Sequence, residues 1–202
     1  MSPERRNRKQ ERARQTYAKI VKTATRLFAR HGYHKTTITD LAQAIGLTSG
    51  AVFHHFPNKG AILNAVVDQL EKGMRVYSDI AEKAESGSPA LVEDVVRIMC
   101  SHFKRDPEAI ICRSALAVEF AGSNHPIEAR LRHMYDVFAC PFAHKLLNHE
   151  GVTNHRAASI AFVGALLGIA VQGLLREGEE SMDAIAKGFL SMIKEWEPDV
   201  KA

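Results

Sequence analysis

Apolar residues recur at three- and four-residue intervals along most of this 202-residue chain, which is the period of an amphipathic helix. In the segment 12–30 the apolar positions form one stripe, and basic residues occupy the opposite face. The stripe consists of Tyr17, Ile20, Val21, Ala24, Leu27 and Phe28, and the opposite face of Lys19, Lys22, Arg26 and Arg30. Gly32 ends this helix, because glycine readily adopts the left-handed conformation that closes a helix. No segment favours a strand, so the pattern predicts an all-α protein.

Capping residues divide the next region into two short helices. Thr37 begins a T-x-x-D pattern with Asp40, a variant of the capping box that starts a helix, and Gly46 ends it. Thr48 caps a third helix, which Pro57 halts because proline cannot continue the hydrogen-bond ladder. Two short helices around a glycine turn predict a helix-turn-helix, whose second helix can enter a DNA major groove. An ordinary helical hairpin is the alternative.

The helix-turn-helix would have a small shared core and a free outer face. The core residues are Leu41, Ala42, Ile45, Leu47, Val52 and Phe56, and the outward residues are Thr48, Ser49, Gly50, Ala51 and His54. Short outward side chains let a helix approach base edges closely, and hydroxyl and imidazole groups supply donors and acceptors.

The remainder of the chain predicts a larger helical domain. Asn58 caps a long helix that fades at the Ser/Gly/Pro-rich break 86–89, which we interpret as a linker. Further helices are expected at about 90–104, 107–121, 127–149, 154–177 and 182–195. We therefore expect an N-terminal arm and DNA-binding domain at 1–58. A second helical domain at 59–202 begins with a connecting helix of about 59–85.

The net charge of +4 is unevenly distributed along the chain. Residues 1–60 contain 12 Lys+Arg against 3 Asp+Glu, a net charge of +9, whereas the remainder has a net charge of −5. A concentrated positive region attracts polyanions, most commonly nucleic acid, although an anionic membrane or a merely solvated face are alternatives. The basic N-terminus lacks the apolar stretch of a signal peptide and is interpreted as an arm. Three widely spaced cysteines without a CxxC motif fit a reducing cytoplasm and indicate no metal site.

The segment TTITDLAQAIGLTSGAVFHHFPNKGAIL, residues 36–63, resembles the N-terminal domain of TetR-type transcriptional regulators. The resemblance extends back through residues 18–37 and covers about the first third of the chain. It implies an all-helical homodimer with three N-terminal DNA-binding helices and a larger domain that binds a ligand and dimerises.

The resemblance also implies roles for individual residues. The base-facing positions are Thr39, Ser49, Gly50, Ala51 and His54, and the positions near phosphate are Thr37, Thr48, Phe53, His55 and Lys59. Phe53 stands where the family most often has tyrosine, and Ser49 replaces a common lysine or arginine. We expect weaker phosphate contacts at these two positions, with arginines of the N-terminal arm as the hypothetical compensation.

The C-terminal domain offers two predicted surfaces. An effector pocket with apolar walls and a few polar groups is predicted from Phe103, Cys112, Leu116, Glu119, Phe120, Met134, Phe138 and Phe142. A dimer interface is predicted along the small-residue stripe Ala161, Gly164, Ala165 and Gly168. This stripe lies in segment 157–175, which is nearly long enough to span a bilayer but is interpreted as a buried helix, so no membrane is expected.

These observations predict a cytoplasmic, ligand-responsive repressor that binds a palindromic double-stranded DNA operator as a homodimer. A largely apolar small-molecule effector would release it, and no cofactor, metal or enzymatic activity is expected. One alternative is an architectural DNA-binding protein without an effector. Another is an enzyme of the helical domain that uses His102, His125, His133 and Glu119. Cys112 beside Arg113 allows a redox-sensing thiol as an alternative to a buried apolar residue.

Overall fold

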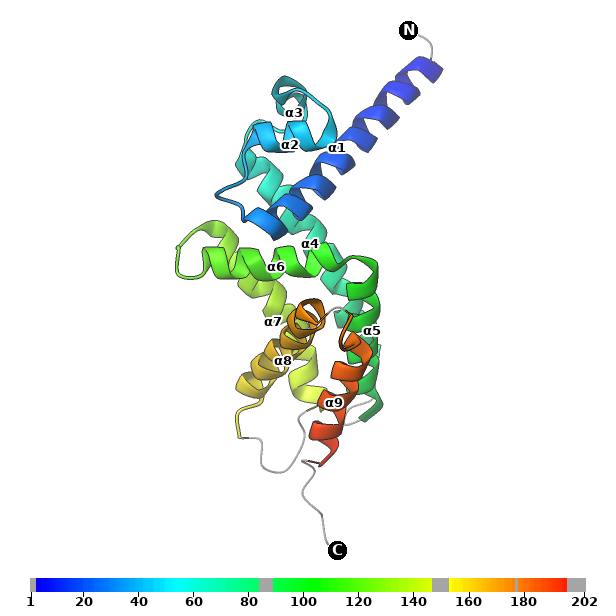
Figure 1. The fold of residues 1–202 in the computed structure, drawn as a ribbon, viewed down its shortest axis with the longest axis vertical. Coiled ribbons are helices and arrows are strands. Elements are labelled where there is room, and N and C mark those ends of the chain that lie inside the picture. Colours follow the sequence, from blue (N-terminus) through cyan, green and yellow to red (C-terminus); the bar gives the residue numbers. More distant parts are fainter. Residues whose placement is uncertain (1–2, 84–88, 147–152, 177, 196–202) are drawn as a thin grey trace, which may run out of the picture. The chain divides into compact units, whose positions relative to one another are not determined.

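The computed structural model describes residues 3–83, 89–146, 153–176 and 178–195 (Figure 1). These ranges contain helices and turns without a strand, which confirms the all-α prediction. The helices are α1 (Pro3–His31), α2 (Ile38–Ile45), α3 (Ser49–His55), α4 (Lys59–Lys83), α5 (Pro89–Arg105), α6 (Pro107–Phe120), α7 (Pro126–Leu146), α8 (His155–Leu175) and α9 (Met182–Glu195).

The chain forms two compact units, each assembled from separate stretches of sequence. Unit 1 consists of Met1–Lys72 and Ile111–Leu131, and unit 2 consists of Gly73–Ile110 and Arg132–Ala202. Helices α4, α6 and α7 therefore contribute residues to both units. The predicted boundary after residue 58 falls inside unit 1, and most of the predicted linker at 86–89 lies outside the described residues.

Helix α1 begins nine residues before the helical pattern predicted by the sequence. Figure 1 shows its N-terminal turns projecting away from the rest of unit 1. The segment predicted as an arm is rich in arginine, lysine, glutamine and glutamate, which favour helix, and Pro3 occupies the first helical position, where proline is tolerated. The periodicity missed these turns because they contain almost no apolar residue. The arm is therefore a continuation of α1.

The core of unit 1 joins the first four helices. The residues predicted for the core of the helix-turn-helix are buried, with the exception of the half-buried Leu47. In α1, Ile20, Ala24 and Phe28 are each 0 % exposed. The ring of Phe56 stacks on that of Tyr17, with 4.7 Å between centroids. These contacts fix α2 and α3 against α1.

Helices α5, α8 and α9 pack on one another in unit 2. Val163, Leu166 and Ile169 of α8 are buried. Where α8 meets α9, a Cβ added at Gly173 would lie 2.7 Å from the terminal carbon of Met182, so the glycine permits this close approach. In the described ranges, α8 is the one helix long and apolar enough to cross a membrane by length and composition, and 28 % of its most apolar stretch is buried.

Candidate nucleic-acid interface

The start of α2 has the capping arrangement that the sequence predicted. The backbone N–H of Asp40 donates to Thr37 Oγ1 at 3.1 Å, while the backbone N–H and the hydroxyl of Thr37 donate to Asp40 Oδ2 at 2.8 and 2.7 Å. These hydrogen bonds lower the pKa of the Asp40 carboxyl below its usual value. The carboxylate of Asp40 therefore stabilises the N-terminus of α2 in its ionised form.

The turn between α2 and α3 depends on a glycine in the left-handed conformation. Gly46 has φ +72°, and the backbone N–H of Leu47 donates to Ala42 O at 2.9 Å. Lys19 of α1 holds the end of α2 as well, donating through Nζ to Ile45 O at 3.0 Å. Thr48 Oγ1 then accepts the backbone N–H of Ala51 at 3.2 Å and caps α3, as predicted.

The predicted base-facing residues form the accessible side of this motif. Thr39, Gly50 and His54 are exposed, and Ser49 and Ala51 are half-buried. A Cβ added at Gly50 would meet one atom within 4 Å, the hydroxyl of Thr48 at 3.9 Å, so the space beside the helix is open. Helix α3 therefore presents a surface of short side chains with one imidazole, and these residues remain predicted DNA contacts.

The residues predicted near phosphate have different surroundings. Thr37 and Thr48 serve as helix caps, and the ring of Phe53 is 50 % exposed on α3. His55 is half-buried, and its ring meets that of His54 edge-on, with 5.5 Å between centroids. Phe53 therefore exposes a ring that has no hydroxyl group to donate to a phosphate.

Lys59 is directed into the protein. Its Nζ donates to the backbone carbonyls of Tyr33, His34 and Thr36 at 3.1, 3.3 and 3.1 Å, and lies 4.3 Å from the centroid of the Tyr33 ring. An ammonium group has three N–H donors, so a phosphate contact by Lys59 would have to replace one of these bonds. Lys59 therefore has a structural role in holding this loop, and its contact with phosphate stays a prediction.

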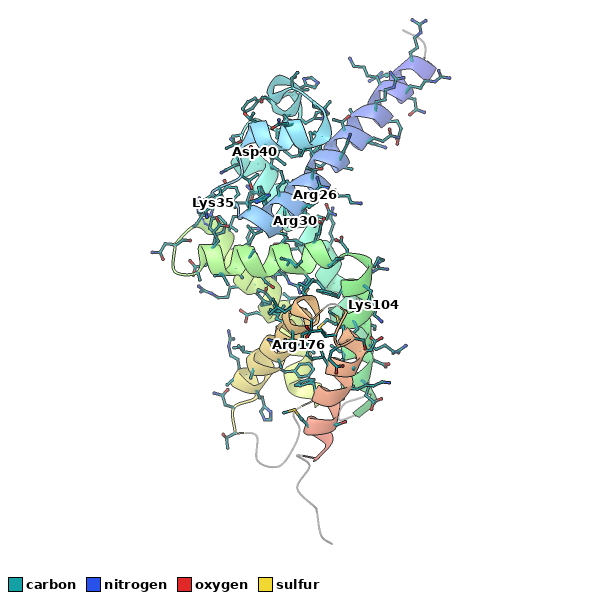
Figure 2. The ribbon with its side chains drawn as sticks, in the orientation of Figure 1. Arg26, Arg30, Lys35, Asp40, Lys104 and Arg176 are labelled. Atoms are coloured by element: carbon teal, nitrogen blue, oxygen red, sulfur yellow. The ribbon has the colours of Figure 1, made fainter. Side chains whose placement is uncertain are left out.

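Exposed basic side chains lie on α1 and in the loop that joins it to α2. Figure 2 labels Arg26 and Arg30 on α1, Lys35 in the loop and Asp40 on α2. Arg26, Arg30 and Lys35 are exposed. In the first turns of α1, residues 5–15 are all exposed and include Arg5, Arg6, Arg8, Lys9, Arg12 and Arg14. The positive charge predicted from the sequence is therefore on the surface of unit 1.

The predicted effector-pocket residues are divided between the two units. Cys112, Leu116 and Phe120 are buried in unit 1, and Phe103 and Met134 are buried residues of unit 2. The side chains of Phe138 and Phe142 lie outside the described residues. Both carboxylate oxygens of Glu119 are bonded to backbone N–H groups at the end of α1, at 2.7 Å each. The structure thus places Glu119 against the loop that joins α1 to α2.

Unit 2 contains a cavity of about 940 Å³ between α5 and α9. Its walls combine apolar and charged residues, among them Val96, Cys100, Lys104, Asp183, Ala186 and Leu190. Lys104 Nζ of α5 lies 2.5 Å from Asp183 Oδ2 of α9, across the cavity. Burial raises the pKa of the Cys100 thiol above its usual value. The sequence predicted Phe103 as a pocket residue of α5 but missed this cavity, because it depends on how α9 returns to α5.

The predicted dimer stripe is accessible along α8. Ala161, Gly164 and Gly168 are exposed, Ala165 is half-buried, and a Cβ at either glycine would have open space. Larger apolar side chains accompany the stripe: Ile160 is 52 % and Leu175 72 % exposed. An apolar helix face of this kind is typical of an interaction surface.

Sequence reasoning missed two long-range contacts of residues 111–131. One is the Glu119 contact, and the other is made by Arg130 on α7, which donates to Glu71 at 3.1 and 2.8 Å, to Asp68 at 2.6 Å and to Asn64 at 3.0 Å. The partners lie 59 to 86 positions apart in sequence, so no local pattern signals them.

Comparison with protein families identifies the region that holds this interface. Residues 20–66 match the model described as bacterial regulatory proteins, tetR family. The HTH-type transcriptional regulator TtgR of Pseudomonas putida is 35 % identical over 79 residues, which is 39 % of this chain and 36 % of that protein. The match therefore spans about a third of the length of this curated relative.

Solved structures share the fold over most of the chain. The MbdR regulator from Azoarcus sp. CIB aligns with a TM-score of 0.76 and 20 % identity, over 87 % of this chain and 95 % of that one. FadR from Bacillus subtilis, solved in complex with stearoyl-CoA, aligns with a TM-score of 0.64 and 16 % identity, over 88 % and 97 %. At these identities the likeness shows the fold alone.

Proposed function

We propose that this chain, whose residues 20–66 match the tetR family of bacterial regulatory proteins, is a DNA-binding transcriptional repressor of that family. The observation that carries the proposal is the helix-turn-helix of α2 and α3. Its turn is fixed by Gly46 and Thr48, and its outer face consists of the exposed or half-buried residues Ser49, Gly50 and His54. Such a helix fits a major groove, where imidazole and hydroxyl groups read base edges.

Selection of bound fragments from a genomic library tests DNA binding directly. A single enriched palindrome supports a sequence-specific repressor, whereas broad binding without sequence preference would indicate an architectural protein. His54→Ala then tests the reading helix: we expect loss of about 1–3 kcal/mol of discrimination at one base position. The control is Gln69→Ala, an exposed substitution on α4, which should leave discrimination unchanged.

We propose further that the repressor acts as a homodimer through α8 and α9. The support is the exposed apolar surface of α8, where Ala161, Gly164 and Gly168 allow a second helix to approach closely. A two-fold dimer would present two copies of α3 to half-sites about one DNA turn apart. This arrangement accounts for a palindromic operator.

A small-molecule effector is the third part of the proposal. FadR of Bacillus subtilis, which has this fold, was solved with stearoyl-CoA bound. Unit 2 contains a cavity of about 940 Å³, within the range of small-molecule sites, with Val96 and Leu190 as apolar wall and Lys104 as a cation. Because Lys104 is already paired with Asp183, we infer only that the effector is largely apolar. It would bind more tightly to the form of the dimer that has low operator affinity.

Displacement from the selected operator by a library of fatty acids, acyl-CoA thioesters and aromatic acids tests this part. A true effector should also raise the melting temperature, since it binds the folded state. Ser101→Trp, at an exposed position lining the cavity, should abolish the response without loss of operator binding. If no library member changes operator affinity, the effector is excluded while DNA binding stands. In that case the protein would act by DNA binding alone.

A further inference from the structure

Glu119 of α6 holds the loop that enters the helix-turn-helix. Its Oε2 accepts the backbone N–H of Tyr33 and its Oε1 that of His34, both at 2.7 Å. The residue is half-buried, and its neighbour Phe120, 2 % exposed, packs against the rings of Tyr33 and His34 at centroid distances of 5.5 and 5.6 Å. One side chain thus fixes two successive peptide groups of the loop.

The same loop is held by its carbonyl groups from another helix. Lys59 Nζ, at the start of α4, donates to the carbonyls of Tyr33, His34 and Thr36. The loop then continues directly into Thr37, the N-cap of α2. An anion on the N–H side and a cation on the carbonyl side therefore fix residues 33–36, and with them the start of α2.

Glu119 lies on a helix that belongs to both units. The first residues of α6 belong to unit 2, whereas Ile111–Phe120 belong to unit 1. The Glu119 carboxylate and the two N–H groups that it accepts all belong to unit 1. Carboxylate hydrogen bonds to backbone N–H groups depend strongly on distance and direction.

From these contacts we propose that Glu119 is a positioning residue for DNA binding. It holds residues 33–36 so that α2 and α3 keep the orientation that fits the operator. This inference rests on the proposed DNA-binding function. It concerns Glu119 alone and does not require that the effector be known.

The test variant is Glu119→Gln, which preserves the shape of the side chain but places an amide N–H₂ group against one of the two backbone donors. Glu128→Gln is a matched control, because Glu128 also accepts two backbone N–H groups, those of Gly122 at 3.2 Å and Asn124 at 3.0 Å, in the turn that precedes its own helix α7. Affinity for the operator selected by the wild type, melting temperature and amide hydrogen exchange at residues 33–36 are measured for all three proteins.

If the Glu119→Gln protein occupies the DNA-competent arrangement about a tenth of the time, its operator affinity falls about tenfold. We expect this loss together with faster exchange at Tyr33 and His34, while Glu128→Gln keeps wild-type affinity. Glu119→Asp, whose shorter side chain retains the charge, should recover part of the affinity and keeps the test valid if the glutamine variant does not fold.

Three results would count against this role. Unchanged affinity of Glu119→Gln would exclude a positioning role and leave the proposed function intact. Equal losses in the Glu119→Gln and Glu128→Gln proteins, in proportion to their melting temperatures, would reduce Glu119 to a structural residue. Failure of the wild type to select any DNA sequence would instead overturn the proposed function, and the positioning role with it.

Discussion

Two phenylalanines three positions apart on and beside α3 have opposite surroundings. Phe53 is 50 % exposed, whereas Phe56 is 3 % exposed and stacked on Tyr17. A hydroxyl added to the first ring would meet solvent or DNA, and one added to the second would enter the core. The pair therefore gives a test of the DNA-facing surface with an internal control.

Phe53→Tyr should tighten operator binding about 2- to 12-fold, because a phenol donates a hydrogen bond that is worth about 0.5–1.5 kcal/mol when it reaches a phosphate oxygen. Fluorescence anisotropy with the selected operator measures the change. Phe56→Tyr should instead lower stability by about 1–3 kcal/mol without tightening binding, since it buries a hydroxyl. Unchanged affinity of the Phe53 variant would argue against its placement near phosphate.

Asp40 gives a pH-dependent test of the helix cap. Its folded-state pKa is lowered by hydrogen bonds from Thr37, so its contribution to stability is fully present above the unfolded pKa of about 3.9 and is lost as pH falls through the lower folded value. Asp40→Asn should therefore melt below the wild type at neutral pH, and the difference should shrink towards pH 3. Thermal melts from pH 7 to pH 3 measure it, and a constant difference would contradict this role.

At the scale of elements, the most informative case is the first part of α1. Its exposed turns carry six arginine and lysine residues between positions 5 and 14 and continue a helix whose later turns form the core of unit 1. A helix presents such side chains on all sides, so roughly half of them are able to face one DNA backbone at a time. This geometry favours phosphate contacts over insertion of an extended arm into the minor groove.

Replacement of these six basic residues by glutamine should weaken operator binding and lower the salt slope. Each lost phosphate contact lowers the magnitude of the slope of log affinity against log salt by about 0.9, so a reduction of about 2–3 is expected. Glutamine is a good helix former, so the variant separates charge from helix length, and circular dichroism verifies that the helix remains. Deletion of residues 3–14 should give the same slope. A slope equal to that of the wild type would remove α1 from the interface.

At the scale of the whole molecule, the chain leaves an apolar helix face exposed. Helix α8 combines Gly164 and Gly168 in open space with Ile160 and Leu175 on the surface, and 28 % of its most apolar stretch is buried. A partner copy would remove this surface from water and would link two DNA-binding domains. Linked domains bind two half-sites with an affinity well above that of either alone.

In the proposed homodimer, Gly164→Arg should separate the two copies into monomers of 22.4 kDa, as measured by light scattering after size exclusion. Loss of the second half-site contact should weaken operator binding at least about 100-fold. Gly73→Arg is the matched control: it also introduces arginine at an exposed glycine on a helix with no atom within 4 Å, and should leave the dimer intact. A Gly164 variant that remains dimeric would exclude this face of α8.

Local sequence determined the helices and the reading motif. Thr37, Gly46, Thr48 and Asn58 act on backbone groups three or four residues away, so their spacing predicted where α2, α3 and α4 begin or end. Periodic apolar residues likewise predicted the core, from Leu41 to Phe56. Where no apolar residue marks the period, as in the first turns of α1, the same reasoning ended the helix too early.

Only the tertiary structure decided which partners the charged side chains bind across long sequence separations. Glu119 meets Tyr33 across 86 positions, Lys59 turns to three carbonyls of the loop, and Arg130 joins α7 to α4. A carboxylate or a guanidinium binds whichever donor or acceptor the packed helices bring within about 3 Å, and sequence spacing does not encode that proximity. The sequence therefore determined the helix-turn-helix surface that we propose reads DNA, and the packing determined which side chains hold that surface in place.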